Sequence, residues 1–366
     1  MPIVSGTLSR YFGLRFLNAA LMVFFSIFVL IAPIDYIELM RRATDVPDVS
    51  LLLVAKTSLF RVPQLCERML PFCVLIGAMF CYLNLSRRME LVVARAAGMS
   101  AWQFVAPAAL VAFLLGVFAT TVYNPVSAYL QEQSKRYEAE LFGQDTNALS
   151  GAGGSFWASQ KDETGQKAII NAKSSRDQGI SLTGVSVFIF DSTGHFKQRV
   201  EASTAALEDG AWLLRDARVT ALATLPVDEP EYRLKTSLTR EQVRESFATP
   251  ESVSFWDLPV YISKAENGGL AAAGYRLQYD KLLARPFFLS AMVFLAAAVS
   301  LRFFRMGGVQ KMVLGGVAAG FLLYVLSKVI DDLSKAELMH PVAAAWLPVL
   351  VGSLTGFIAL LYQEDG

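Results

Sequence analysis

The chain contains 366 residues, of which 54% are hydrophobic and 18% are charged. Soluble proteins contain about 45 to 50% apolar residues, so this composition excludes an ordinary soluble protein and indicates an integral membrane protein. The formal net charge of +1 argues against a nucleic-acid-binding surface and against an acidic tail.

The first apolar run, residues 16–34, is long enough to cross a bilayer, for which about 20 residues are needed. Arg10 and Arg15 precede the run, and positively charged residues collect on the cytoplasmic side of membrane spans. We therefore expect the chain to emerge outside at Asp35. The run lacks a small-residue cleavage site, which predicts an uncleaved anchor.

The second span runs back to about residue 85 and carries charges in its outer half. Arg61 and Arg68 lie seven residues apart, hence on nearly the same face of a helix, an arrangement suited to gripping an anionic headgroup. The alternative is that they snorkel, or pair with Glu67 and position the helix.

The three cysteines, Cys66, Cys73 and Cys81, fall on one helix face of the same span. A disulfide requires Cα atoms within about 7 Å, which excludes pairing within one straight helix. The two histidines, His195 and His340, lie in other regions of the sequence, so we expect no metal site and assign the cysteines to packing.

The segment SRRMELVVARAAGMS, residues 86–100, is a short charged stretch between two long apolar runs. Apolar residues recur in it at helical spacing and predict one apolar face: Met89, Val92, Val93 and Ala96. Arg88 and Arg95 lie seven apart on another face of the same helix, and Gly98 predicts its end. We therefore predict a cytoplasmic docking helix over residues 86–98; the alternative is a polar turn whose arginines only set topology.

A third span, residues 102–123, returns the chain to the outside. Residues 125–281 are then extracytoplasmic, and within them residues 143–250 predict an all-β domain. The predicted strands are residues 155–159, 167–172, 181–191, 195–205, 212–221, 231–237 and 242–247. Short strands between turns indicate a sandwich, jelly roll or open barrel.

Three more spans follow in residues 282–366 and bring the C-terminus to the same side as the N-terminus: residues 286–301, 312–329 and 342–362. A basic cluster precedes them on the outer side, against the positive-inside trend: Arg276, Lys281 and Arg285. The last two spans each carry a glycine pair that allows close helix packing: Gly316 with Gly320, and Gly352 with Gly356.

The sequence lacks the common nucleotide-binding and hydrolase motifs, so we expect it not to be an enzyme. If the chain performs work, the energy must come from another subunit. The docking helix over residues 86–98 is then the best-placed contact.

The order of three spans, β domain and three spans resembles the lipopolysaccharide-export permeases LptF and LptG over essentially the whole chain. The segments that carry the resemblance are SRRMELVVARAAGMS, SFWDLPVYI, ARPFFLSAMVFLAAAVSLRFFRMGG and GGVAAGFLLYVLSKVIDDLS. DYIELMRR after the first span and the SFWDLP segment are more similar to LptG. The resemblance implies a bacterial inner-membrane protein, residues 1–124 forming spans one to three, with a periplasmic jelly-roll-like domain.

The resemblance also implies partners: a heterodimer of LptF and LptG with two copies of the ATPase LptB, which would bind ATP and Mg²⁺, so that no cofactor is expected on this chain. Lipopolysaccharide would pass towards LptC and a periplasmic bridge. In the family, the helix matching residues 90–98 sits in a groove of the ATPase, which implies coupling contacts at Glu90, Arg87, Arg88, Arg95 and Gly98. Basic residues at the outer ends of the first two spans would hold lipid A phosphates: Arg41, Arg42, Lys56, Arg61 and Arg68.

Two other classes of protein stay open at this point. A lipoprotein-release or efflux permease would also need an external ATPase, but such permeases place their outer domain after the first span. A membrane-anchored envelope scaffold or sensor predicts neither an ATPase partner nor bound lipid.

Overall fold

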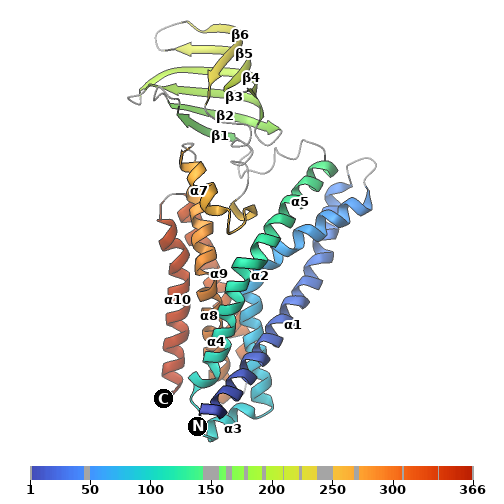
Figure 1. The fold of residues 1–366 in the computed structure, drawn as a ribbon, viewed down its shortest axis with the longest axis vertical. Helices are drawn as coiled ribbons and strands as arrows, with labels where there is room; N and C mark the ends of the chain where they lie inside the picture. Colours follow the sequence, from blue (N-terminus) through green and yellow to red (C-terminus); the bar gives the residue numbers. More distant parts are fainter. Residues whose placement is uncertain are drawn as a thin grey trace.

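The computed structural model describes residues 2–44, 50–142, 156–161, 167–176, 180–191, 195–208, 210–221, 225–236, 250–267, 272–306, 309–336 and 338–364. The described chain contains six helices long and apolar enough to cross a membrane. A β-sheet domain lies at one end of the helix bundle, and the short helix α3 and both chain termini lie at the other (Figure 1). We call these the β-domain end and the α3 end.

The first half of the bundle consists of α1 (Pro2–Ala43), α2 (Leu51–Arg87), α3 (Glu90–Ala96), α4 (Ala101–Phe118) and α5 (Asn124–Phe142). A π-helical turn, Ala119–Tyr123, joins α4 to α5, so Pro125 does not end the helix. At 1.5 Å per residue, the 42 residues of α1 extend about 63 Å, roughly twice the hydrocarbon thickness of a bilayer. The long helices α1, α2 and α5 extend toward the β-domain end of the bundle (Figure 1).

The second half contains α7 (Leu258–Asn267), α8 (Ala273–Met306), α9 (Val309–Lys335) and α10 (Pro341–Glu364). The glycine pairs lie where helices touch, because a side chain there would collide with the neighbour. Gly316 and Gly320 of α9 face Met79 and Leu75 of α2. A Cβ added at Gly356 of α10 would lie 2.7 Å from the Cβ of Phe294 on α8. The predicted close packing is confirmed.

The inserted domain is one antiparallel sheet whose six described strands are paired in chain order. The strands are β1 (Phe156–Lys161), β2 (Lys167–Arg176), β3 (Ser181–Phe190), β4 (Phe196–Glu208), β5 (Ala211–Ala221) and β6 (Val227–Lys235). The predicted all-β insertion between the third and fourth spans is confirmed. The predicted strand over residues 242–247 lies outside the described residues.

The core of the sheet follows the predicted alternation. Val185, Val187 and Ile189 are all buried on one face of β3, where Trp212 of β5 is also buried. Strand β6 begins four residues before the predicted start at residue 231 and includes Pro230. Among the described strands β6 lies at the edge of the sheet, where a missing N–H donor is tolerated. Cys66, Cys73 and Cys81 are buried and unpaired, as their assignment to packing predicts.

Candidate functional site: the charged ends of the helix bundle

At the β-domain end, a buried carboxylate ties the first two helices together. Asp35 of α1 accepts hydrogen bonds from the Ser58 hydroxyl at 2.8 Å and from Nη2 of Arg61 at 2.7 Å. Glu138 of α5 lies 3.7 Å from the same guanidinium. The side chains of Arg61 and Asp35 are 17% and 6% exposed. Arg61, a predicted phosphate ligand, is thus already neutralised inside the protein.

Three other predicted phosphate ligands stay open to their surroundings. Arg41 and Arg42, in the last turn of α1, share the single carboxylate of Glu38 at 3.0 Å, and their side chains are 76% and 55% exposed. Exposed pairs of this kind contribute little to stability, so a phosphate can replace Glu38 at little cost. Lys56 of α2 is exposed and forms no ion pair within the described chain.

Arg68 does not join this group. It lies twelve residues beyond Lys56 on α2, about 18 Å along the helix, and its Nη2 is 3.4 Å from Glu251. Lys335 of α9 lies 3.7 Å from the other oxygen of that carboxylate. Glu251 belongs to the short 3₁₀ turn Pro250–Ser252 that leads from the β domain back to the bundle. The five predicted phosphate ligands therefore do not form one cluster.

A second buried carboxylate, Glu67 of α2, has a partner that differs from the alternative considered for Arg61 and Arg68, in which one of them pairs with Glu67. It does not pair with Arg61 or Arg68; Nη1 of Arg285 on α8 lies 2.5 Å away, and the two side chains are 6% and 18% exposed. Asn124 donates a hydrogen bond to Glu67 at 2.8 Å, and the Ser127 hydroxyl donates another.

This network also contacts the segment that leads from the β domain back to the bundle. The Asn124 side-chain oxygen accepts a hydrogen bond from the backbone N–H of Phe255 at 2.9 Å. The basic cluster before the fourth span is likewise paired, since Lys281 lies 2.6 Å from Asp331 of α9. Its departure from the positive-inside trend is explained by these interhelical ion pairs.

At the α3 end, the predicted docking helix is shorter than expected. Helix α2 continues through Arg87, the chain reverses at Met89 with φ of 60°, and α3 covers only Glu90–Ala96. The prediction that Arg88 and Arg95 share a helix face is wrong, because Arg88 lies in the turn before α3. The predicted stop at Gly98 is confirmed, since its φ of 84° favours glycine.

The apolar side chains of α3 divide into two sets. Leu91 and Ala94 are buried against the bundle, whereas Met89, Val92 and Val93 are 61%, 42% and 67% exposed. The surroundings of this exposed apolar face are basic: Arg87, Arg88 and Arg95 are all exposed. The arrangement presents a compact apolar patch with a positive rim, as a protein-docking surface requires.

Glu90 does not belong to that exposed face. Its Oε2 accepts a hydrogen bond of 2.9 Å from the Tyr11 hydroxyl, whose oxygen accepts one of 3.1 Å from Nε of Arg15. Glu90 therefore links α3 to α1 through Tyr11, for which the sequence gives no signal, and through Arg15, which the sequence marks only as a topology charge. Their separation from Glu90, 79 residues in the case of Tyr11, left no sequence signal for the contact.

Comparison with known proteins places the whole chain in one family. A family model described as lipopolysaccharide export system permease LptF/LptG matches residues 10–362. The chain is 23% identical over 350 residues to the lipopolysaccharide export system permease protein LptG of Escherichia coli K12, covering 94% of each chain. It is 23% identical over 357 residues to the LptG of Haemophilus influenzae, covering 94% of this chain and 95% of that one. The predicted closer similarity to LptG agrees with these relatives, and the chain belongs to the lipopolysaccharide export permease family LptF/LptG.

Proposed function

We propose that this chain is a membrane subunit of an ATP-driven exporter, which extracts lipopolysaccharide from the inner membrane and passes it to a periplasmic bridge. The observation that carries the proposal is the separation of two surfaces along one bundle. An apolar docking patch on α3 lies at one end, and open arginines and a β domain lie at the other (Figure 1). Such a subunit transmits work from one side of a membrane to a lipid on the other.

The proposed orientation places α3 and both termini in the cytoplasm and the β domain in the periplasm. Arg10, Arg15, Arg87, Arg88 and Arg95 all lie near the α3 end, which agrees with the positive-inside trend. The exposed basic residues of the β-domain end then face lipid A phosphates, and the cytoplasmic patch faces LptB, which binds ATP and Mg²⁺. The paralogous permease LptF and the protein LptC complete the proposed assembly.

In the proposed mechanism, nucleotide-driven movement of the ATPase displaces α3. Glu90 carries this displacement to α1, because the hydrogen bonds through Tyr11 and Arg15 join the two helices. The first span ends in the open pair Arg41 and Arg42, so movement of α1 alters the position of the proposed phosphate ligands.

Docking on α3 is tested by Val93→Asp, which places a charge on the apolar patch. We expect it to weaken recovery of the ATPase with the purified permease complex by about tenfold or more, because the carboxylate loses its water on docking. The matched control is Val227→Asp in the β domain, where the valine is also exposed, at 56%. Equal recovery from both variants would contradict docking on this face.

The coupling contact is tested with Glu90→Arg in a reconstituted complex. We expect lipopolysaccharide release per ATP hydrolysed to fall, because an arginine at position 90 repels Arg15. Tyr11→Phe removes the hydrogen bond to Glu90 and keeps the negative charge of Glu90, so it separates the contribution of the hydrogen bond from that of the charge. Unchanged ATPase assembly and unchanged release in Glu90→Arg would rule out the coupling role.

The lipid-facing residues are tested with the double variant Arg41→Gln, Arg42→Gln. Each cation near a membrane surface strengthens the binding of an anionic headgroup about fivefold, so the loss of two should lower crosslinking of lipopolysaccharide to the permease by about 25-fold. Arg276→Gln is the control and is compared with Arg41→Gln alone, since this exposed arginine also pairs with a glutamate, Glu266, on α7. An equal loss in the control would show that the arginines act only through net charge.

A further inference from the structure

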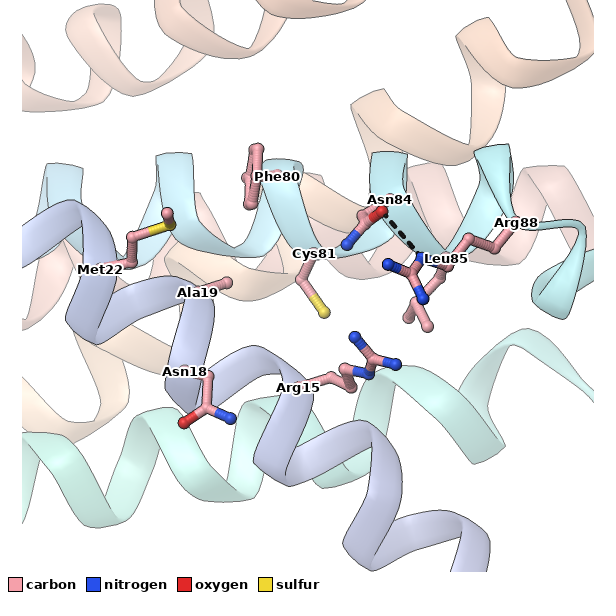
Figure 2. Close-up of a pocket in the computed structure, with 9 residues that line it drawn as sticks. All are labelled: Arg15, Asn18, Ala19, Met22, Phe80, Cys81, Asn84, Leu85 and Arg88. Carbon is pink, nitrogen blue, oxygen red and sulfur yellow. Dashed lines mark hydrogen bonds between the residues drawn. The ribbon is translucent and has the colours of Figure 1, made fainter.

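A pocket between α1 and α2 at the α3 end gives Arg15 and Arg88 a further role, beyond the coupling contact and the rim of the docking patch. Its volume is about 150 Å³. Its walls come from α1, from α2 and from the residue that follows α2: Arg15, Asn18, Ala19 and Met22 of α1, Phe80, Cys81, Asn84 and Leu85 of α2, and Arg88. Figure 2 shows the guanidinium groups of Arg15 and Arg88 directed into the same space beside Cys81 and Leu85. Two cations from different helices thus share one small pocket.

The two guanidiniums have little internal compensation. Nε of Arg15 is bonded to the Tyr11 hydroxyl, and Nε of Arg88 donates a weak hydrogen bond of 3.3 Å to Asn84. Within the described residues, neither forms an ion pair with a carboxylate; the nearest acid in this network, Glu90, reaches Arg15 only through Tyr11. The described lining of the pocket contains two guanidiniums and no carboxylate, and each guanidinium keeps its terminal N–H donors for an anion.

The surroundings of the pocket set the size and kind of the anion. A volume of 150 Å³ accommodates a phosphate with a few attached atoms, whereas whole-ligand sites have volumes of about 300 to 1,000 Å³. Met22 and Phe80, at the rim, are 61% and 47% exposed and extend the pocket into an apolar surface. A group with a phosphate head and apolar chains satisfies both features.

The depth of the pocket agrees with a lipid headgroup. Arg15 immediately precedes the apolar run of α1, and Arg88 directly follows the last residue of α2, so both lie at the boundary of the hydrocarbon core. In the proposed orientation this boundary belongs to the cytoplasmic leaflet, where anionic lipids collect and where basic pockets between helices bind their headgroups. Cys81 and Leu85 in the walls are buried and apolar, and apolar surroundings strengthen the attraction between charges.

From these observations we infer that the pocket binds the phosphodiester headgroup of an anionic phospholipid of the cytoplasmic leaflet, with its acyl chains lying over Met22 and Phe80. The two guanidiniums provide N–H donors for the two unesterified oxygens of a phosphodiester. The inference rests on the proposed orientation of the permease. It adds a second lipid site, at the opposite end of the bundle from the proposed phosphate ligands, where a bound lipid bridges α1 and α2 beside the Glu90 contact.

The test is native mass spectrometry of the full-length permease complex titrated with phosphatidylglycerol, phosphatidylcholine or soluble glycerol 1-phosphate. We expect phosphatidylglycerol to bind more tightly than the other two. Arg15→Gln and Arg88→Gln should each weaken its binding about fivefold, while Arg15→Lys keeps most of it. Arg10→Gln, which removes an exposed arginine of α1 outside the pocket, is the matched control.

Three results would overturn the inference: equal losses in Arg15→Gln and Arg10→Gln, equal binding of phosphatidylcholine, or equally tight binding of glycerol 1-phosphate. Arg88 is exposed, so Arg88→Gln provides a folded variant if Arg15→Gln is unstable. The readout requires neither ATP hydrolysis nor lipopolysaccharide. A failure of the proposed transport function would therefore leave the lipid titration unaffected, and a failed titration would leave transport untouched.

Discussion

Replacing Arg285 with methionine removes the cationic partner of Glu67, the carboxylate buried between α2, α5 and α8. Removing one partner of a buried ion pair costs about 3 to 5 kcal/mol, because an uncompensated charge stays inside. Asn124 and Ser127 still donate hydrogen bonds to the carboxylate, and bonds to a charged group contribute about 1.5 to 3 kcal/mol each. We therefore expect the lower part of that range, about 3 kcal/mol of unfolding free energy.

The assay is reversible unfolding of the purified permease in mixed detergent micelles, carried out as a double-mutant cycle. Glu67→Gln removes the charge and keeps a similar shape, so the double variant with Arg285→Met no longer contains an unpaired carboxylate. The cost of the double variant should fall short of the sum of the single costs by at least about 1 kcal/mol, as is usual for residues in contact. The energetic link between α2 and α8 is then measured directly.

The matched control for this cycle is Lys328→Met. Lys328 lies 3.7 Å from Asp332, and the two side chains are 55% and 62% exposed, so its loss should cost at most about 0.5 kcal/mol. Additive costs in the Glu67 cycle, or equal costs for Arg285→Met and Lys328→Met, would refute the reasoning. They would mean that the buried network does not hold the β-domain end of the bundle together.

Two further predictions concern packing. Gly77→Ala should destabilise the bundle by about 1 to 3 kcal/mol in the same unfolding assay, because the new Cβ would lie 2.7 Å from the Cα of Ala20 on α1. Gly6→Ala, with nothing within 4 Å, should be neutral or stabilising by up to about 1 kcal/mol. Trp212→Ala should cost about 3 to 5 kcal/mol in the β domain, because this buried indole fills its core. Circular dichroism of the strand signal during unfolding checks the last value, and an unchanged transition would contradict it.

The membrane spans and the β domain were predictable from sequence because the patterns that produce them are local. Hydropathy marks a helix that must satisfy its own backbone in lipid, and alternation marks a strand with one buried face. The helix stop at Gly98 was equally predictable from sequence, since a left-handed backbone conformation after a helix favours glycine whatever surrounds it. The break at Met89 was missed, because methionine carries no local signal for a positive φ.

Only the tertiary structure decided which charges are paired and which are open. The sequence predicts the same role, a phosphate ligand, for Arg61 and Arg41. In the structure Arg61 is buried against Asp35 of α1, whereas Arg41 is exposed at a helix end. The partner of Glu67 is 218 residues away, a separation over which sequence spacing carries no information about contact. Ion pairing depends on distances between helices, and these distances are set by packing at positions such as Gly77 and Gly356, not by the charged residues themselves.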